Sequence, residues 1–133
     1  MIEITVETAA GVSRAWVKRV LQRALKYQKV SDRGLSVLLT GNKKIRAINK
    51  QYLGHDYATD VISFGLDEKD FLGDIVVSVE MARRKAKELG LTYKEELARY
   101  LIHGVLHLLG YKDKTKKDYL IMHKRQEKIL RWL

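Results

Sequence analysis

Two histidines lie four residues apart in the segment 100–110, YLIHGVLHLLG. Apart from these two histidines, all residues from Leu101 to Leu109 are aliphatic or glycine, which predicts a helix that is buried on nearly all sides. Residues at positions i and i+4 of a helix project from the same face, so His103 and His107 are expected to point the same way. This is the spacing at which one helix offers two imidazole nitrogens to one metal ion.

A third candidate ligand follows this helix after a glycine. Gly110 is expected to end the helix in a left-handed conformation and to turn the chain back, and Asp113 comes three residues later. The pattern H-x-x-x-H-x-x-G-x-x-D therefore predicts a metal site made of His103, His107 and Asp113. Two imidazoles and one carboxylate occupy three positions of a tetrahedral zinc ion and leave the fourth for water, as in catalytic zinc sites.

The same residues also have a purely structural interpretation. A buried histidine is often a hydrogen-bonded core residue, and Asp113 lies between Lys112 and Lys114 like an ordinary solvated aspartate. Two buried histidines in one helix would each need a polar partner, and a missing partner costs about 1–3 kcal/mol. We therefore favour metal binding. His55 and His123 have no comparable pattern around them, and both are expected to be exposed.

The composition indicates one basic domain without thiol chemistry. A chain of 133 residues suffices for a single domain over residues 1–133. Its net charge of +10, from 26 Lys and Arg against 16 Asp and Glu, favours a polyanionic partner such as nucleic acid. The absence of cysteine excludes disulfides, iron–sulfur clusters and a catalytic thiol. The sequence shows neither a secretory signal nor a bilayer-spanning segment, so a cytoplasmic location is expected.

The hydrophobic pattern predicts a single α/β (α+β) domain with a small mixed four-stranded sheet and about five helices. Ser13 is expected to cap the first helix, and Thr92 with Glu95 forms a capping-box pattern. The tract 65–73 is expected to be a turn or a hairpin connection. The expected strands cover residues 2–7, 35–40, 61–64 and 74–79, and the expected helices cover residues 14–28, 43–52, 81–90, 93–109 and 116–132.

The residue after the first histidine distinguishes two kinds of metal chemistry. Metzincin-type peptidases share the histidine and glycine spacing but place a glutamate, the general base, directly after the first histidine. This chain has Gly104 there, which disfavours a metallopeptidase. A metal ion that lowers the pKa of its bound water needs no such base. Since the chain is strongly basic, we favour attack of metal-activated water on a phosphodiester over attack on a peptide.

Three segments resemble the motifs of one family, the YbeY-type endoribonucleases. Residues 103–111 read HGVLHLLGY and look like the family signature HGxLHLxGYDH. Residues 49–64 read NKQYLGHDYATDVISF and are similar to N-x-x-Y-R-x-x-D-x-P-T-D-V-L-S-F. Residues 72–90 read LGDIVVSVEMARRKAKELG and match L-G-D-I-x-I-x-x-E-x-A. The segments occur in the family's order and cover most of residues 35–113.

The resemblance implies a zinc-dependent, single-strand-specific endoribonuclease that acts in 16S rRNA 3′-end maturation and ribosome quality control. It implies rRNA, the small ribosomal subunit and its assembly factors as partners, with no membrane, and we favour a monomer. By position, the metal ligands and catalytic residues are His103, His107 and Asp113. The residues that the resemblance places in the cleft near the metal are Thr59, Asp60 and Ser63.

Two positions depart from the family pattern. Asp113 replaces the third histidine, and its negative charge should make the bound water less acidic. Leu53 replaces an arginine that stabilises charge on the phosphate, a loss on the order of 3 kcal/mol of transition-state stabilisation if no other cation compensates. Arg46 or Lys50, on the preceding helix, is the candidate substitute. Leu53 thus keeps an alternative open, namely a ribosome-assembly factor that binds RNA and has a structural or vestigial metal site.

Basic residues are concentrated in the two terminal helices. Residues 112–133 carry eight Lys or Arg against three acidic residues, and the first helix carries five Lys or Arg. Such faces are often only solvated surface. We predict that they contact the RNA backbone and set affinity without selecting sequence.

Overall fold

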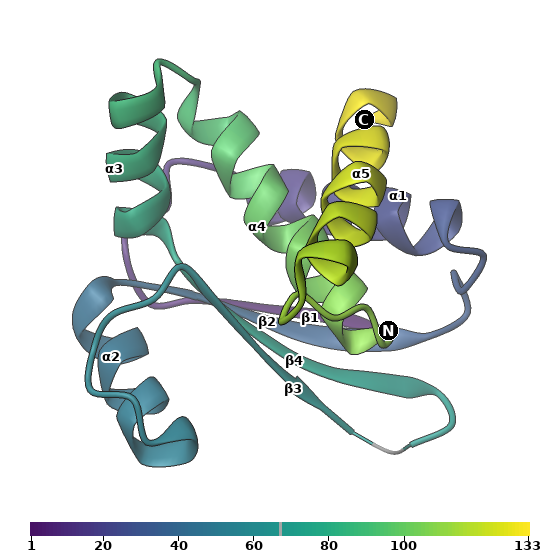
Figure 1. Cartoon of the computed structure of the whole chain (residues 1–133), viewed down its shortest axis with the longest axis horizontal. Coiled ribbons are helices and arrows are strands. Elements are labelled where there is room, and N and C mark those ends of the chain that lie inside the picture. The colour runs from purple at the N-terminus through teal and green to yellow at the C-terminus, as the bar shows by residue number, and fades with distance from the viewer. Residues whose placement is uncertain (67) are drawn as a thin grey trace.

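The computed structural model describes residues 1–66 and 68–133 and contains four strands and five helices in these ranges (Figure 1). Asp67, which falls within the predicted turn over 65–73, lies outside the described residues. The elements in chain order are β1 (Ile2–Val6), α1 (Arg14–Tyr27), β2 (Gly34–Thr40), α2 (Asn42–Leu53), β3 (Val61–Gly65), β4 (Phe71–Ser78), α3 (Val79–Leu89), α4 (Tyr93–Leu108) and α5 (Lys116–Trp132).

The strands form one mixed sheet in the order β1-β2-β4-β3. Strands β1, β2 and β4 are parallel, and β3 pairs with β4 in the antiparallel sense. The central strands β2 and β4 have apolar residues on both faces, as expected for strands covered on both sides, whereas the edge strand β1 alternates between half-buried and exposed positions. The predicted α/β class and the small mixed sheet are confirmed.

Helices cover the sheet unequally. Figure 1 shows α1, α3, α4 and α5 on one face of the sheet and α2 on the other. The main core lies under the larger group of helices, where Leu97, Leu101 and Val105 of α4 are fully buried. A smaller cluster of Ile45 and Ile62 with Val76 lies under α2. Because α4 lies in the middle of the larger layer, its side chains are held by neighbours on several sides.

The two predicted helix caps, Ser13 and Thr92, are confirmed, whereas the helices predicted from residues 43 and 81 begin earlier, at Asn42 and Val79. The Ser13 and Thr92 side chains accept hydrogen bonds from backbone N–H groups three residues later, at 3.0 and 3.1 Å. The strand predicted over 74–79 is wrong at both ends. The β3–β4 hairpin continues pairing to Gly65 and Gly73, so β4 begins at Phe71. Ser78 then caps α3, which makes the following residue helical.

None of the helices in the described ranges combines the length and the apolar composition needed to cross a bilayer.

Candidate metal centre

Helix α4 lies close to the sheet at Gly104, the residue directly after the first histidine. A Cβ atom added to Gly104 would lie 2.7 Å from Ile75 Cγ2 on β4, so a side chain at this position would push the helix away. On the same turn, Ser63 Oγ of β3 donates a hydrogen bond to the Gly104 carbonyl at 3.2 Å. Close packing therefore explains why glycine follows the first histidine, and it fixes the orientation of His103 and His107.

The chain after α4 returns to the face that carries the histidines. Gly110 has a φ of +98°, a conformation that favours glycine, as predicted. Its N–H donates to the His107 carbonyl at 3.0 Å, and the N–H of Tyr111 donates to the Leu106 carbonyl at 3.0 Å. This turn brings the Asp113 carboxylate next to the two imidazoles.

The three predicted ligands converge on one point. His103 Nε2 and His107 Nε2 are 3.1 Å apart, and Asp113 Oδ2 lies 3.2 Å from His107 Nε2 and 3.6 Å from His103 Nε2. In the described parts of the chain this is the one group of three or more such side chains with metal-binding spacing. The side chains are 25–39% exposed, so solvent reaches the cluster.

The donor atoms of this cluster suit a divalent transition metal. Two imidazole nitrogens and one carboxylate oxygen are ligands that zinc accepts at about 2.0–2.2 Å, and a tetrahedron with such bonds has edges of roughly 3.3 Å. The three separations of 3.1, 3.2 and 3.6 Å are close to that edge length. The residues present therefore fit a metal ion held by three protein ligands with one position left open.

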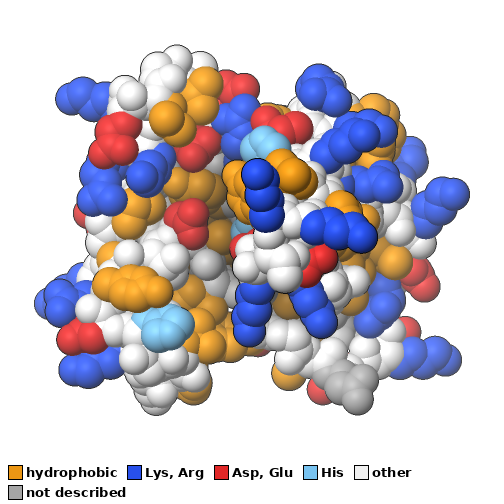
Figure 2. Space-filling model, in the orientation of Figure 1, with side chains coloured by type: hydrophobic (Ala, Val, Ile, Leu, Met, Phe, Trp, Pro, Cys, Tyr) orange, Lys and Arg blue, Asp and Glu red, His pale blue; other side chains and the backbone are white. Residues whose placement is uncertain are grey.

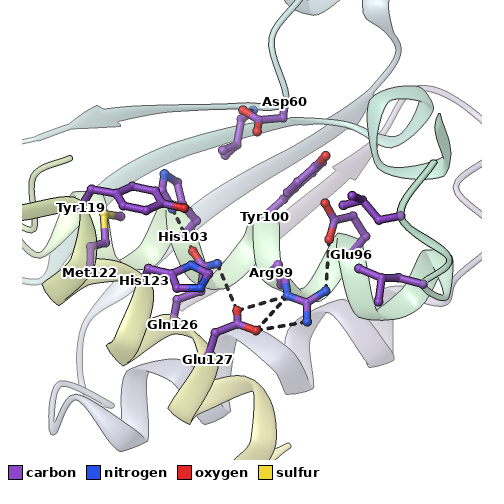
Figure 3. Close-up of a pocket in the computed structure, with 13 residues that line it drawn as sticks. Asp60, Glu96, Arg99, Tyr100, His103, Tyr119, Met122, His123, Gln126 and Glu127 are labelled. Atoms are coloured by element: carbon purple, nitrogen blue, oxygen red, sulfur yellow. Dashed lines mark hydrogen bonds and ion pairs between the residues drawn. The ribbon is translucent and has the colours of Figure 1, made fainter. Parts of the chain in front are cut away.

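A residue that the sequence analysis missed supports the first histidine. Gln126 of α5 is only 8% exposed, and its Oε1 lies 2.9 Å from His103 Nδ1 (Figure 3). Its Nε2 donates to Glu127 at 3.3 Å, so the amide oxygen must face the imidazole. Nδ1 of His103 therefore donates the proton, and Nε2, which faces His107 and Asp113, carries the lone pair a metal requires.

Two carboxylate–guanidinium contacts hold this support in place. Arg99 Nη2 lies 3.1 Å from Glu127, and Arg99 Nη1 lies 3.2 Å from Glu96 (Figure 3). Burial lowers the pKa of His103, partly offset by its hydrogen bond to Gln126. The neutral imidazole is thus the favoured form, and it is the form that binds metal. The sequence signal for Gln126 is a polar residue between Met122 and Ile129 on the buried face of α5.

Two cavities flank the cluster. The first, of about 420 Å³, is lined by His103 and Asp60 among others. The second, of about 320 Å³, is lined by His107, Thr59 and Ser63 among others. The structure therefore divides the three predicted cleft residues between the two sides of the cluster.

The predicted basic substitutes lie elsewhere. Arg46 Nε forms an ion pair with Asp56 Oδ1 at 2.9 Å, and Lys50 Nζ lies 3.9 Å from the same carboxylate. Arg46 lines a separate cavity beside that ion pair. Leu53, by contrast, lines the cavity next to His107 and is 48% exposed. The position at which the resemblance implies an arginine is thus open to the site.

The remaining histidines are exposed, as predicted, and each lines one of the two cavities. His55 stacks on Tyr57 beside the His107 cavity, and His123 stacks on Tyr119 beside the His103 cavity. Lys and Arg side chains gather over the side of the molecule formed by α5 and α1 (Figure 2). The group formed by His103, His107 and Asp113 therefore lies beside a basic surface, and aromatic side chains line both cavities.

Known proteins resemble the chain over nearly its whole length. A model of the family described as Endoribonuclease YbeY matches residues 3–133. A curated protein of that name from Persephonella marina is 38% identical over 126 residues, covering 90% of this chain and 82% of its own. Another from Sulfurihydrogenibium sp. is 40% identical, covering 89% and 82%. A solution structure of a Thermotoga maritima protein is 32% identical with a TM-score of 0.74, covering 98% and 87%.

Proposed function

The chain belongs to the YbeY family of endoribonucleases and is a hydrolase of RNA, and we propose that His103, His107 and Asp113 hold the divalent metal that this reaction uses. The observation that carries the proposal is the convergence of three donor atoms at separations of 3.1–3.6 Å. We propose zinc as the metal, because zinc accepts this ligand set. When bound, it would supply Lewis acidity and activate a water molecule near neutral pH.

The residues around the ligands have distinct proposed roles. Gln126 orients His103 and keeps its Nε2 free of a proton. Ser63 fixes the helix between the two histidines through the Gly104 carbonyl, so it positions the site. Thr59 donates to Asp60 at 3.3 Å, and these two residues, which line different cavities, are proposed to contact the RNA.

The two predicted basic residues are poorly placed to stabilise charge on the phosphate. Arg46 is bound to Asp56, and its guanidinium would have to leave that carboxylate to reach the substrate. The pKa of Asp56 is lowered by the hydrogen bond from Arg46, so the carboxylate remains a charged competitor at neutral pH. We therefore propose that Leu53 limits the rate, and that Arg46 and Lys50 contribute mainly long-range attraction to RNA.

Ribosomal RNA is the proposed natural substrate. The basic surface over α5 and α1 suits a polyphosphate chain, and the small ribosomal subunit with its assembly factors would present the single-stranded rRNA. We propose that the protein acts in the cytoplasm and as a monomer. The alternative of an RNA-binding assembly factor without catalysis is not favoured, because the curated relatives carry the name of an endoribonuclease.

Cleavage of single-stranded RNA tests the proposal. Metal-loaded protein is incubated with short single-stranded rRNA fragments, beside His107→Ala and the control Asp32→Ala, which removes an exposed carboxylate that is not part of the group with metal-binding spacing. We expect cleavage by the unmodified protein and the control, and a rate at least about a thousandfold lower for His107→Ala. Equal rates for all three proteins would contradict the assignment of the site.

A further inference from the structure

We propose that the cavity between α3, α4 and α5 binds a nucleobase of the RNA next to the cleaved phosphate, and that it prefers guanine. The inference rests on the proposed function, since it assumes that the phosphate lies at the metal cluster. The cavity has a volume of about 420 Å³, and His103 forms part of its wall. A nucleotide whose phosphate contacts the cluster therefore has its base within reach of this cavity.

The charge of the cavity excludes the phosphate itself. Three carboxylates line it, from Asp60, Glu96 and Glu127, whereas Arg99 provides a single guanidinium that is already bound to two of them. A cavity with this balance repels a phosphate group even though the whole chain carries +10. It favours an uncharged group that is rich in hydrogen-bond donors, and nucleobases with amino groups are such groups.

The polar end of the cavity presents acceptors. Glu96 is only 7% exposed, with Arg99 bound on one side, and the buried Tyr100 lies between it and Asp60 (Figure 3). Burial and these two carboxylates raise the pKa of Tyr100, so its phenol remains protonated. Because Arg99 engages Glu96 and Glu127, the acceptor that we assign to the base is the exposed Asp60 carboxylate. Guanine offers adjacent N1–H and N2–H donors, which match a carboxylate, whereas uracil offers one N–H between two carbonyl oxygens.

The other end of the cavity is an aromatic and apolar surface. Tyr119 and His123 lie four residues apart on α5, and their rings stack with centroids 5.6 Å apart and an angle of 14° between their planes. Tyr119 is 48% exposed, so its ring is available at the cavity rim. Met122 lies beside Tyr119 and adds apolar wall (Figure 3). Aromatic rings at the edge of a groove that binds single strands are typical stacking surfaces for bases.

A metal ion is a poor alternative occupant. The carboxylates of the cavity do not form a group with metal-binding spacing, since within the described residues that criterion is met by the three proposed zinc ligands. Two of the carboxylates are also engaged by Arg99. An aromatic surface for stacking, combined with hydrogen-bond acceptors in the wall, fits a base better than it fits a cation.

Nucleotide binding tests the inference without relying on cleavage. Guanosine, inosine and uridine 5′-monophosphates are titrated into the metal-loaded protein by calorimetry, beside Tyr119→Ala, Tyr119→Phe and the control Leu120→Ala. Leu120 is exposed on the neighbouring position of α5 and is not among the described residues that line the cavity. We expect guanosine monophosphate to bind about tenfold more tightly than uridine monophosphate, with inosine monophosphate between them.

The variants separate stacking from general effects. Tyr119→Ala should weaken guanosine monophosphate about tenfold, while Tyr119→Phe and Leu120→Ala should leave it within twofold, since phenylalanine keeps the aromatic face. Asp60→Asn, which keeps an acceptor for the Val61 N–H but loses the charge, should reduce the preference for guanine at least about threefold. Affinities for the three nucleotides within twofold of one another, or an unchanged affinity in Tyr119→Ala, would overturn the inference.

A second titration distinguishes failure of this inference from failure of the proposed function. Guanosine and uridine, which lack phosphate, are titrated into metal-free protein. Preference for guanosine there supports the base cavity even if RNA cleavage by the metal-loaded protein fails. Metal-dependent cleavage together with equal binding of both nucleosides would contradict base binding in this cavity but would still support the proposed metal centre.

Discussion

The two cavities beside the metal cluster differ in how firmly their walls are fixed. On the His103 side, the imidazole is held by Gln126, which is bound in turn to Glu127 and Arg99. On the His107 side, the wall includes the exposed Leu53. The comparison indicates that the imidazole on one side is firmly oriented for the proposed metal, whereas the other side has a leucine where the family resemblance implies a cation. Metal affinity and catalytic rate should therefore respond to different substitutions.

The largest effect that separates the two sides is expected for Gln126→Leu. This substitution removes the acceptor at His103 Nδ1, so the imidazole is no longer fixed in the metal-binding tautomer. We expect the affinity for zinc to fall about 10- to 100-fold. Competition with a chromophoric chelator measures it. Gln126→Glu, which keeps an acceptor, should retain more of the affinity, and equal losses in both variants would point to a packing role instead.

Packing under the cluster, shared by both sides, is tested by Gly104→Ala. The added methyl group would meet Ile75 at 2.7 Å and push α4 from the sheet. We expect the free energy of unfolding to fall by about 1–3 kcal/mol, measured by urea denaturation. Gly65→Ala is the matched control, because space is open around that glycine and its φ is not positive. A stability loss no larger than that of the control would mean that the helix can move without cost.

The smallest effect is expected on the His107 side, from Leu53→Arg. A guanidinium in this cavity would stabilise the charge that develops on the phosphate, and we expect kcat to rise about tenfold with little change in zinc affinity. Single-turnover cleavage of single-stranded RNA measures the rate. Leu53→Met serves as the uncharged control. An unchanged or lower rate for the arginine variant would show that another cation already serves the phosphate.

The parts of the site that were predictable from the sequence depend on local geometry. The spacing of His103 and His107 follows from the helical repeat, and the position of Asp113 follows from the conformation that Gly110 allows. The fold class was predictable as well, because the periodicity of apolar residues indicates whether one face or both faces of an element are buried. Even there, the ends of β4 were wrong, because hairpin pairing and the Ser78 cap decided them.

The missed features depend on contacts between distant segments. Gln126 reaches His103 across 23 positions in the chain, and only the packing of α5 against α4 brings them together. The same holds for Asp60 and Thr59, which are adjacent in the loop before β3 but line different cavities, because residues from other segments complete the walls of each cavity. The pairing of Arg46 with Asp56 depends on how that loop folds back on α2. Helical or strand periodicity carries no information on such contacts.

Zinc titration of the metal-free protein tests the central claim most directly. Calorimetry on the unmodified chain, Asp113→Ala and the control Asp32→Ala measures stoichiometry and affinity together. We predict one zinc ion per chain for the unmodified protein and the control, and an affinity at least about a hundredfold lower for Asp113→Ala. Zinc binding that is absent from the unmodified protein, or equally tight in all three, would contradict the metal centre.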